Sequence, residues 1–219
     1  MEYLDDEIVL KAGESDFTLI PFGCLHADDP GFRKNLWFQC VDDLLQPRTY
    51  GIGCGDYRNL ARTTYRKHIR GYMKDENSQG DLDNVIKSEM RTFYRENRFD
   101  ELAKAGRILG LGKGNHHWEF KNGTNDTQFL CDLMNVPYLD NPCFIRLRVK
   151  LYDRVVLAFK ILFHHGDWGG GAATIGSDIN SASNRAKPFD FDIYIFSHTH
   201  RKYGVPIARL TIPEHGELR

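Results

Sequence analysis

Short apolar runs, several of them followed by a glycine, recur along the chain. Runs of this length bounded by turn residues are typical of buried strands. They predict strands at residues 17–22, 50–54, 107–111, 144–151, 155–163 and 191–196. Helical segments separate several of these strands, so the pattern predicts an α/β fold.

Apolar residues recur at helical spacing in two of the intervening segments, residues 32–45 and 126–134. This spacing predicts that each segment forms a helix with one apolar face against a sheet. Thr124, Asn125 or Asp126 can accept hydrogen bonds from the first backbone N–H groups of the second helix. The pattern therefore predicts that this helix starts close to residue 126.

Residues 59–98 are polar and charged, with helical patches on both sides of a break at 78–80. We expect a helical excursion on the surface of a single domain that spans residues 1–219. Its cationic side chains are either a solvated face or a patch that binds substrate phosphate. The cations in and just before this segment include Arg58, Arg62, Arg66, Lys67 and Arg70.

Charge and composition narrow the range of functions. The chain has 29 Lys and Arg against 30 Asp and Glu, a net charge of −1, which weakly disfavours action along long nucleic acids. No apolar run approaches the roughly 20 residues that cross a bilayer, and the acidic residues 1–7 do not resemble a signal peptide. Five cysteines without a Cys-x-x-Cys pair favour reduced thiols. We therefore expect a cytoplasmic protein that does not bind membranes.

Five of the predicted loops carry side chains of the kinds that bind metal ions. The motifs are Gly23-Cys24-Leu25-His26, Gly55-Asp56-Tyr57-Arg58-Asn59, Gly114-Asn115-His116, His164-His165-Gly166-Asp167 and His198-Thr199-His200. Each motif follows a predicted strand, and ligand sites in open α/β sheets gather at the carboxyl ends of strands. One such motif alone is usually a turn, but five in order predict one shared site.

The residue types in these loops suit a pair of divalent cations. Imidazoles and carboxylates bind Mn, Fe, Zn or Ni, and Asp56 can bridge two ions while Asn115 binds through its amide oxygen. Two cations about 3.5–4 Å apart can clamp phosphate oxygens and turn a bound water into hydroxide. A histidine outside the ligand set can protonate a leaving group.

The order of these motifs resembles that of the calcineurin-like metallophosphoesterases, from about residue 17 to residue 200. The glycine-rich stretch at residues 165–171 is similar to a variant among phage and bacterial members. The resemblance implies a two-sheet β-sandwich flanked by helices, in four layers, with a dinuclear metal centre. It also implies a role for each motif residue.

In that family pattern, His26 and His200 bind the first metal, and Asp56 bridges the two metals. Asn115, His165 and His198 bind the second metal, and His116 acts as the acid or orients the phosphate. His164 and His165 are adjacent on a strand and face opposite ways, so only His165, directly before Gly166, is expected to be a ligand. Arg58 and His164 are candidates for binding the substrate phosphate.

The chain departs from the family pattern at His117, where the family often has an acidic residue, and at the position two residues before the first histidine. The family has aspartate two residues before the first histidine, and this chain has Cys24. Either the Cys24 thiolate binds a borderline metal such as Zn, or Cys24 is a small buried residue beside a weak or absent first metal. Trp118 and Trp168 can each either cover the core or stack on an organic group of the substrate.

The expected activity is that of a phosphoesterase in which a metal-bound hydroxide attacks a phosphomonoester or phosphodiester. One alternative is a nuclease that acts on DNA or RNA, supported by the local cations. Another is a binding or scaffold module that keeps the fold but has weakened catalysis, supported by Cys24. The expected partner is a phosphate-ester substrate, nucleic acid stays open as a second one, and the sequence favours no particular oligomeric state.

Overall fold

Four short parallel strands form the sheet that carries the first candidate loops. The computed structural model describes residues 2–60, 76–166 and 177–198. The strands lie in the order β2 (Thr18–Phe22), β3 (Thr49–Gly53), β4 (Ile108–Gly112) and β5 (Tyr138–Leu139). All neighbouring pairs are parallel, so every loop that leaves a carboxyl end emerges at one edge of the sheet.

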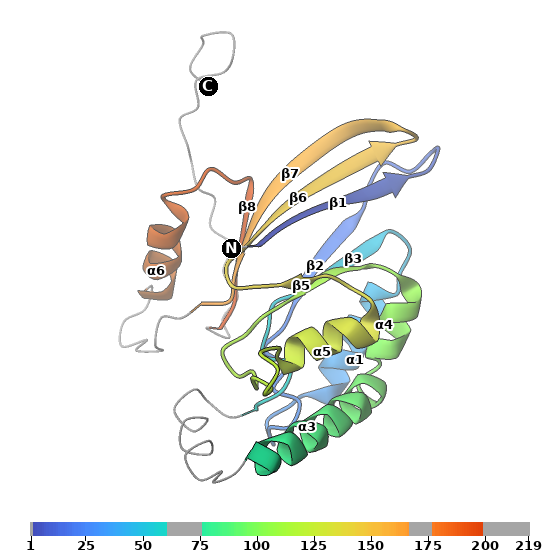
Figure 1. The fold of residues 1–219 in the computed structure, drawn as a ribbon. Coiled ribbons are helices and arrows are strands. Elements are labelled where there is room, and N and C mark those ends of the chain that lie inside the picture. The colour runs from blue at the N-terminus through green and yellow to red at the C-terminus, as the bar shows by residue number, and fades with distance from the viewer. Residues whose placement is uncertain (1, 61–75, 167–176, 199–219) are drawn as a thin grey trace.

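A second sheet of four strands packs against the first. Its order is β1 (Glu2–Leu10), β6 (Cys143–Leu151), β7 (Arg154–His164) and β8 (Ile193–Phe196). β6 runs antiparallel to β7, whereas β1 is parallel to β6 and β8 is parallel to β7. Side chains of both sheets share one apolar core, for example Ile52 of β3 and Phe163 of β7. Figure 1 shows the two sheets.

Helices cover the other face of the parallel sheet (Figure 1). They are α1 (Lys34–Leu44), α3 (Glu76–Glu96), α4 (Phe99–Ala105) and α5 (Asp126–Met134). A fifth described helix, α6 (Ser177–Ala186), lies beside β8. Together the elements make a mixed α/β fold with two sheets, which confirms the predicted fold class at that level. Among the described helices, none is both long and apolar enough to span a bilayer.

The predicted strands and helices match the structure within a few residues. The helix at 126–134 is α5, and Asn125 caps it. The Asn125 side chain accepts a hydrogen bond from the Gln128 backbone N–H, and the Gln128 side chain accepts one from the Asn125 backbone. This reciprocal pair satisfies two N–H groups that a helix start leaves without partners.

The acidic N-terminal residues form strand β1, which the sequence pattern did not predict. Ile8 and Leu10 face the core, while Asp5 and Glu7 face outward. The two carboxylates pair with Arg146, Arg148 and Lys150 of β6. The acidic charges of this segment are thus balanced by a strand far away in the sequence.

The structure describes the second half of the predicted excursion as one helix, α3, with one face packed on the core. α3 continues through residues 78–80, where a break was predicted. It buries Ile86, Met90 and Phe93 in the core beside the parallel sheet. A glycine inside a helix costs about 1 kcal/mol relative to alanine, and burying three large apolar side chains outweighs that cost. The helical patch predicted before that break falls mostly on residues 61–75, which lie outside the described residues.

Candidate metal centre

The loops after β2 and β3 run side by side beyond the ends of their strands. The Cys24 N–H donates to the Gly55 carbonyl at 2.8 Å, and the His26 N–H donates to the Asp56 carbonyl at 3.0 Å. These bonds continue the parallel pairing of the strands for several residues. As a result, two candidate ligands of the first loop lie next to the carboxylate of the second.

Two glycines allow the loops after β3 and β4 to approach each other closely. Gly55 has φ +86°, and a Cβ there would lie 2.6 Å from the Gly114 nitrogen and 2.8 Å from His165 Nδ1. A Cβ on Gly114 would overlap with Asp56 Oδ1. Any side chain at either position would therefore push the loops apart.

Four candidate ligands adopt a left-handed backbone conformation that residues other than glycine seldom use. They are Cys24, His26, Asp56 and His198, with φ between 44° and 74°. The described residues include eight such non-glycine positions, so half of them fall at this one site. Strained backbone of this kind concentrates at functional sites, where the surrounding structure holds it in place.

Asp56 lies at the centre of the site and is only 4% exposed. Its Oδ1 accepts the His116 backbone N–H at 2.9 Å, and its Oδ2 lies 2.9 Å from His165 Nε2 and 3.8 Å from His26 Nε2. Burial by itself raises the pKa of Asp56, but the hydrogen bonds and charges of His165 and His116 outweigh burial and hold this pKa below its ordinary value. The group is therefore an anion surrounded by imidazoles.

The hydrogen bonds of His165 define which of its ring nitrogens faces the carboxylate. Nδ1 lies 2.7 Å from the Cys54 carbonyl, which can only accept, so Nδ1 carries a proton. Ser197 Oγ, which itself donates to that carbonyl, lies 2.9 Å from Nδ1. In the neutral ring Nε2 then has no hydrogen and can only accept. It nevertheless faces two oxygens, Asp56 Oδ2 at 2.9 Å and Asn115 Oδ1 at 3.1 Å. These three groups are potential acceptors that converge on one point, an arrangement that a proton on Nε2 or a metal cation stabilises.

Two groups of potential ligand atoms meet at Asp56. One group is Cys24, Asp56 and His165, and the other is His26, Asp56 and His116, with the atoms of each group within 4.8 Å of one another. The resemblance divides these residues differently, because it assigns the position of Cys24 to the same metal as His26 and gives His116 the role of acid. The assignment of each side chain to one of two metals therefore stays a prediction.

Cys24 lies among these groups as a thiol. Burial raises the pKa of Cys24 to about 11, while the His198 backbone N–H, 3.4 Å from Sγ, acts in the opposite direction. A nearby divalent cation favours the thiolate, since the ligand form of cysteine is deprotonated. Both alternatives for Cys24, metal ligand or small buried residue, stay open.

The remaining predicted residues differ in how close they lie to Asp56, and some lie outside the described residues. His198 is close to the site, with its ring 5.4 Å from that of His165. Arg58 pairs with Asp28 at 3.3 Å and with Glu89 at 3.8 Å, so its guanidinium already contacts two carboxylates. The Gly166 N–H donates to His164 Nδ1 at 2.9 Å, and Arg185 Nη1 lies 3.5 Å from His164 Nε2. His200, Asp167, Trp168 and the following glycines lie outside the described residues, as do Arg62, Arg66, Lys67 and Arg70.

Three polar residues at the site have roles that the sequence motifs did not indicate. Asn59 Oδ1 lies 2.6 Å from His116 Nδ1, Asn141 Oδ1 accepts the His165 backbone N–H at 2.9 Å, and Ser197 contacts His165 as described above. Asn59 belonged to a recognised motif, but nothing local indicated its partner. Asn141 had no signal at all, because its contact joins segments that only the fold brings together.

Trp118 belongs to the core and does not face a substrate. It is 2% exposed, its indole N–H donates to Asp83 at 2.9 Å, and its backbone N–H donates to Asp126 at 2.6 Å. These bonds anchor the loop that carries His116 to α3 and α5.

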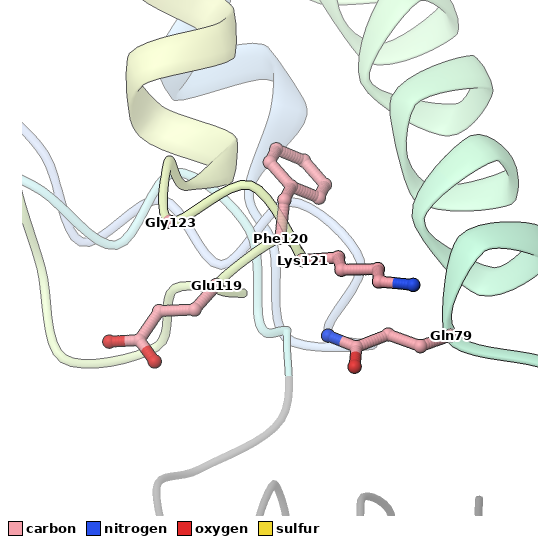
Figure 2. A pocket seen from close by; sticks show the side chains of 5 residues that line it. All are labelled: Gln79, Glu119, Phe120, Lys121 and Gly123. Atoms are coloured by element: carbon pink, nitrogen blue, oxygen red, sulfur yellow. The ribbon is translucent and has the colours of Figure 1, made fainter. Parts of the chain in front are cut away.

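A hollow of about 480 Å³ lies farther along this loop (Figure 2), lined by Gln79, Glu119, Phe120, Lys121 and Gly123. None of these lining residues is a candidate ligand.

A scan of protein-family models, a search of curated proteins and a search of solved structures each returned no match to this chain. Its function must therefore be inferred from the geometry of the site and from the order of its motifs.

Proposed function

We propose that the protein is a phosphoesterase that depends on two divalent cations, with the four-layer sandwich fold of the calcineurin-like family. The substrates are phosphomonoesters or phosphodiesters. The family assignment is supported by the order of five motifs along the chain and by the meeting of described residues from all five around Asp56. The observation that carries the proposal is the Asp56 carboxylate shared by two groups of ligand atoms.

The residues around Asp56 fit divalent cations better than they fit protons alone. Imidazole nitrogen, carboxylate and amide oxygen and a thiol are the ligands that Zn, Mn and Fe accept. His165 is held as a ligand would be, with Nδ1 bonded to a backbone carbonyl and Nε2 turned toward the other donors. When bound, two divalent cations withdraw charge from a phosphate ester and lower the pKa of water at the site.

His116 is the residue that we assign to proton transfer. Its Nδ1 faces Asn59 Oδ1 at 2.6 Å, and Asn59 Nδ2 lies 3.5 Å from Asp29 Oδ2. The amide of Asn59 thus turns its oxygen toward His116, so Nδ1 donates to it and Nε2 is the atom that exchanges a proton. The ring can then protonate the oxygen of the departing alcohol.

Metal content and hydrolysis together test the proposal. The full chain is loaded with Mn, its bound metal is counted by mass spectrometry, and turnover of p-nitrophenyl phosphate and bis-p-nitrophenyl phosphate is measured. We expect two metals per chain and turnover that stops when a chelator removes them. General-acid catalysis typically contributes 10²–10⁴-fold in rate, so His116→Gln should lower kcat by about that factor on an alkyl ester such as glycerol phosphate, and much less on the p-nitrophenyl esters, whose phenol leaves readily as an anion. Because the proposal assigns His116 to proton transfer and not to a metal, the variant should keep both metals. Asp43→Asn, an exposed change on α1, is the control.

Three outcomes would contradict the proposal. A chain that binds no divalent cation at Asp56 would overturn the metal centre itself. A chain that binds two cations but hydrolyses neither ester would favour the weakened binding module. Cleavage of single-stranded or duplex DNA with no turnover of the small esters would contradict small esters as the substrates and would favour the nuclease.

A further inference from the structure

The loop after β2 carries two consecutive aspartates just beyond the candidate ligand His26. The Asp29 N–H donates to the His26 carbonyl at 2.8 Å, which closes this part of the loop into a turn. The Ala27 N–H donates to the Tyr57 carbonyl at 3.1 Å, which holds the loop alongside the segment that follows β3. Asp28 therefore lies beside the two residues that come directly after Tyr57.

The Asp28 carboxylate contacts both of those residues. Its Oδ1 accepts the Asn59 backbone N–H, and its Oδ2 accepts the Arg58 Nε–H at 3.3 Å. Nη2 of Arg58 also lies 3.8 Å from Glu89 of α3. The side chains of Arg58 and Asp28 are only 12% and 31% exposed, and hydrogen bonds to a charged group are stronger than neutral ones. The carboxylate thus holds the backbone of Asn59 and is itself held through Arg58.

Asn59 carries this anchoring to the residue that we assign to proton transfer. Its Oδ1 lies 2.6 Å from His116 Nδ1, and its Nδ2 lies 3.5 Å from Asp29 Oδ2. The His116 ring also meets the His26 ring edge to face, with centroids 4.9 Å apart. A side-chain amide orients a ring precisely only when its own backbone is fixed, and the bond to Asp28 fixes it. The position of the His116 ring therefore depends on Asp28.

We propose that Asp28 is a positioning residue for proton donation, because by holding the backbone of Asn59 it keeps His116 where the ring can protonate the departing oxygen. The inference rests on the proposed function, in which His116 is the acid. Asp28 is not among the ligand atoms grouped around Asp56. A proton donor contributes most when the alcohol is a poor leaving group, so the substrate class is the phosphate esters of aliphatic alcohols.

The leaving group distinguishes positioning of the acid from general support of the site. Misplacing a catalytic group by about 1 Å can cost about 100-fold, so Asp28→Ala in the Mn-loaded full chain should lower kcat for glycerol phosphate by roughly 10–100-fold. The kcat for p-nitrophenyl phosphate should change little, because its phenol leaves without a proton, and both metals should remain bound. Equal losses of kcat on the two esters would overturn the proposal.

The conservative variant Asp28→Asn identifies which contact matters. Its side-chain oxygen can still accept the Asn59 N–H, so this variant should retain most of the kcat for glycerol phosphate. A loss as large as that of Asp28→Ala would mean that the charge beside Arg58 matters and not the bond to Asn59, which would overturn the proposal.

A double-mutant cycle tests whether Asp28 acts through Asn59. Asn59→Ala removes the amide that faces His116, so adding Asp28→Ala to it should cost little more on glycerol phosphate, whereas additive losses would contradict the proposal. Asp16→Ala is the matched control, because it removes another carboxylate that accepts an arginine Nε–H, that of Arg48 at 3.2 Å. It should leave both rates unchanged, and a selective loss on glycerol phosphate like that of Asp28→Ala would overturn the proposal.

NMR of the chelator-treated full chain, labelled with ¹⁵N at histidine, tests the same link without turnover. At one fixed pH, the His116 Nδ1–H should give a signal protected from exchange in the wild type and in Asp28→Asn, and should lose that protection in Asp28→Ala; His116→Gln assigns the signal. Equal protection in Asp28→Ala, or no such signal in the wild type, would overturn the proposal. If the wild type hydrolyses no ester, the proposed function fails, while this measurement still decides whether Asp28 holds Asn59 against His116.

Discussion

Replacing Asp56 by asparagine should abolish the stabilisation by both cations in one step, because its carboxylate belongs to both groups of ligand atoms. A ligand that binds only the folded state at a hundred times its Kd stabilises that state by about 2.7 kcal/mol. In a chain of 219 residues, 1 kcal/mol shifts Tm by about 2–4 °C. Each cation should therefore raise Tm by roughly 5–11 °C, and two cations by roughly twice that.

The assay is thermal unfolding of chelator-treated protein with increasing Mn. Each variant is compared with its own Tm in the absence of Mn, so that the change in intrinsic stability cancels. Asp56→Asn should show almost none of the wild-type increase, whereas His26→Gln, which belongs to one group only, should keep about half of it. Asp43→Asn should behave as wild type. An Asp56→Asn protein that keeps the full increase would refute the idea of a shared bridging carboxylate.

Three further predictions follow from single residues. Gly114→Ala should displace the Asp56 carboxylate, because the added Cβ would overlap with it. The affinity for Mn, measured by calorimetry, should then fall at least tenfold. Unchanged Mn affinity would mean that the loops after β3 and β4 need not approach so closely. Asn125→Ala removes the bond that the Asn125 side chain accepts from the Gln128 N–H, while the Asn125 backbone N–H can still donate to Gln128. The variant should lower the free energy of unfolding, measured in urea, by about 1 kcal/mol, with Asn122→Ala in the preceding exposed turn as comparison. Burial raises the pKa of Cys24 to about 11, so only about one thiol in a thousand is ionised at pH 8. The rate at which Cys24 is alkylated in metal-free protein, followed by mass spectrometry, should therefore increase about tenfold per pH unit up to that pKa. An alkylation rate that does not change with pH would contradict the raised pKa.

The sequence pattern predicted the strands that end in glycine because their apolar runs are local signals. β2, β3 and β4 each have this form, and the loops after them carry the candidate ligands. β1 escaped prediction for the opposite reason. Its carboxylates are balanced only by the cations of β6, and no local pattern indicates such a partner.

At the site, residue types and their order predicted the convergence on Asp56 but not the contacts that orient the ligands. Asn59 beside His116 and Asn141 beside His165 depend on how distant loops pack. Trp118 was ambiguous in the sequence, because an aromatic residue next to a site can face the substrate or the core. The hydrogen bond from the Trp118 indole N–H to Asp83 of α3 shows that the ring faces the core. The sequence pattern could not predict that bond, because it placed this helix on the surface.

The register of β1 against β6 has a consequence for how the chain acquires its fold. Glu2 is opposite Cys143 and Leu10 is opposite Leu151, so β1 is synthesised well before β6 and cannot pair until that distant segment has followed. Contacts between such distant segments slow folding, because the intervening loop must close before the contact contributes. During that interval Ile8 and Leu10 stay in water, and we expect the nascent chain to depend on early docking of the parallel sheet with its helices to remain soluble until β6 arrives.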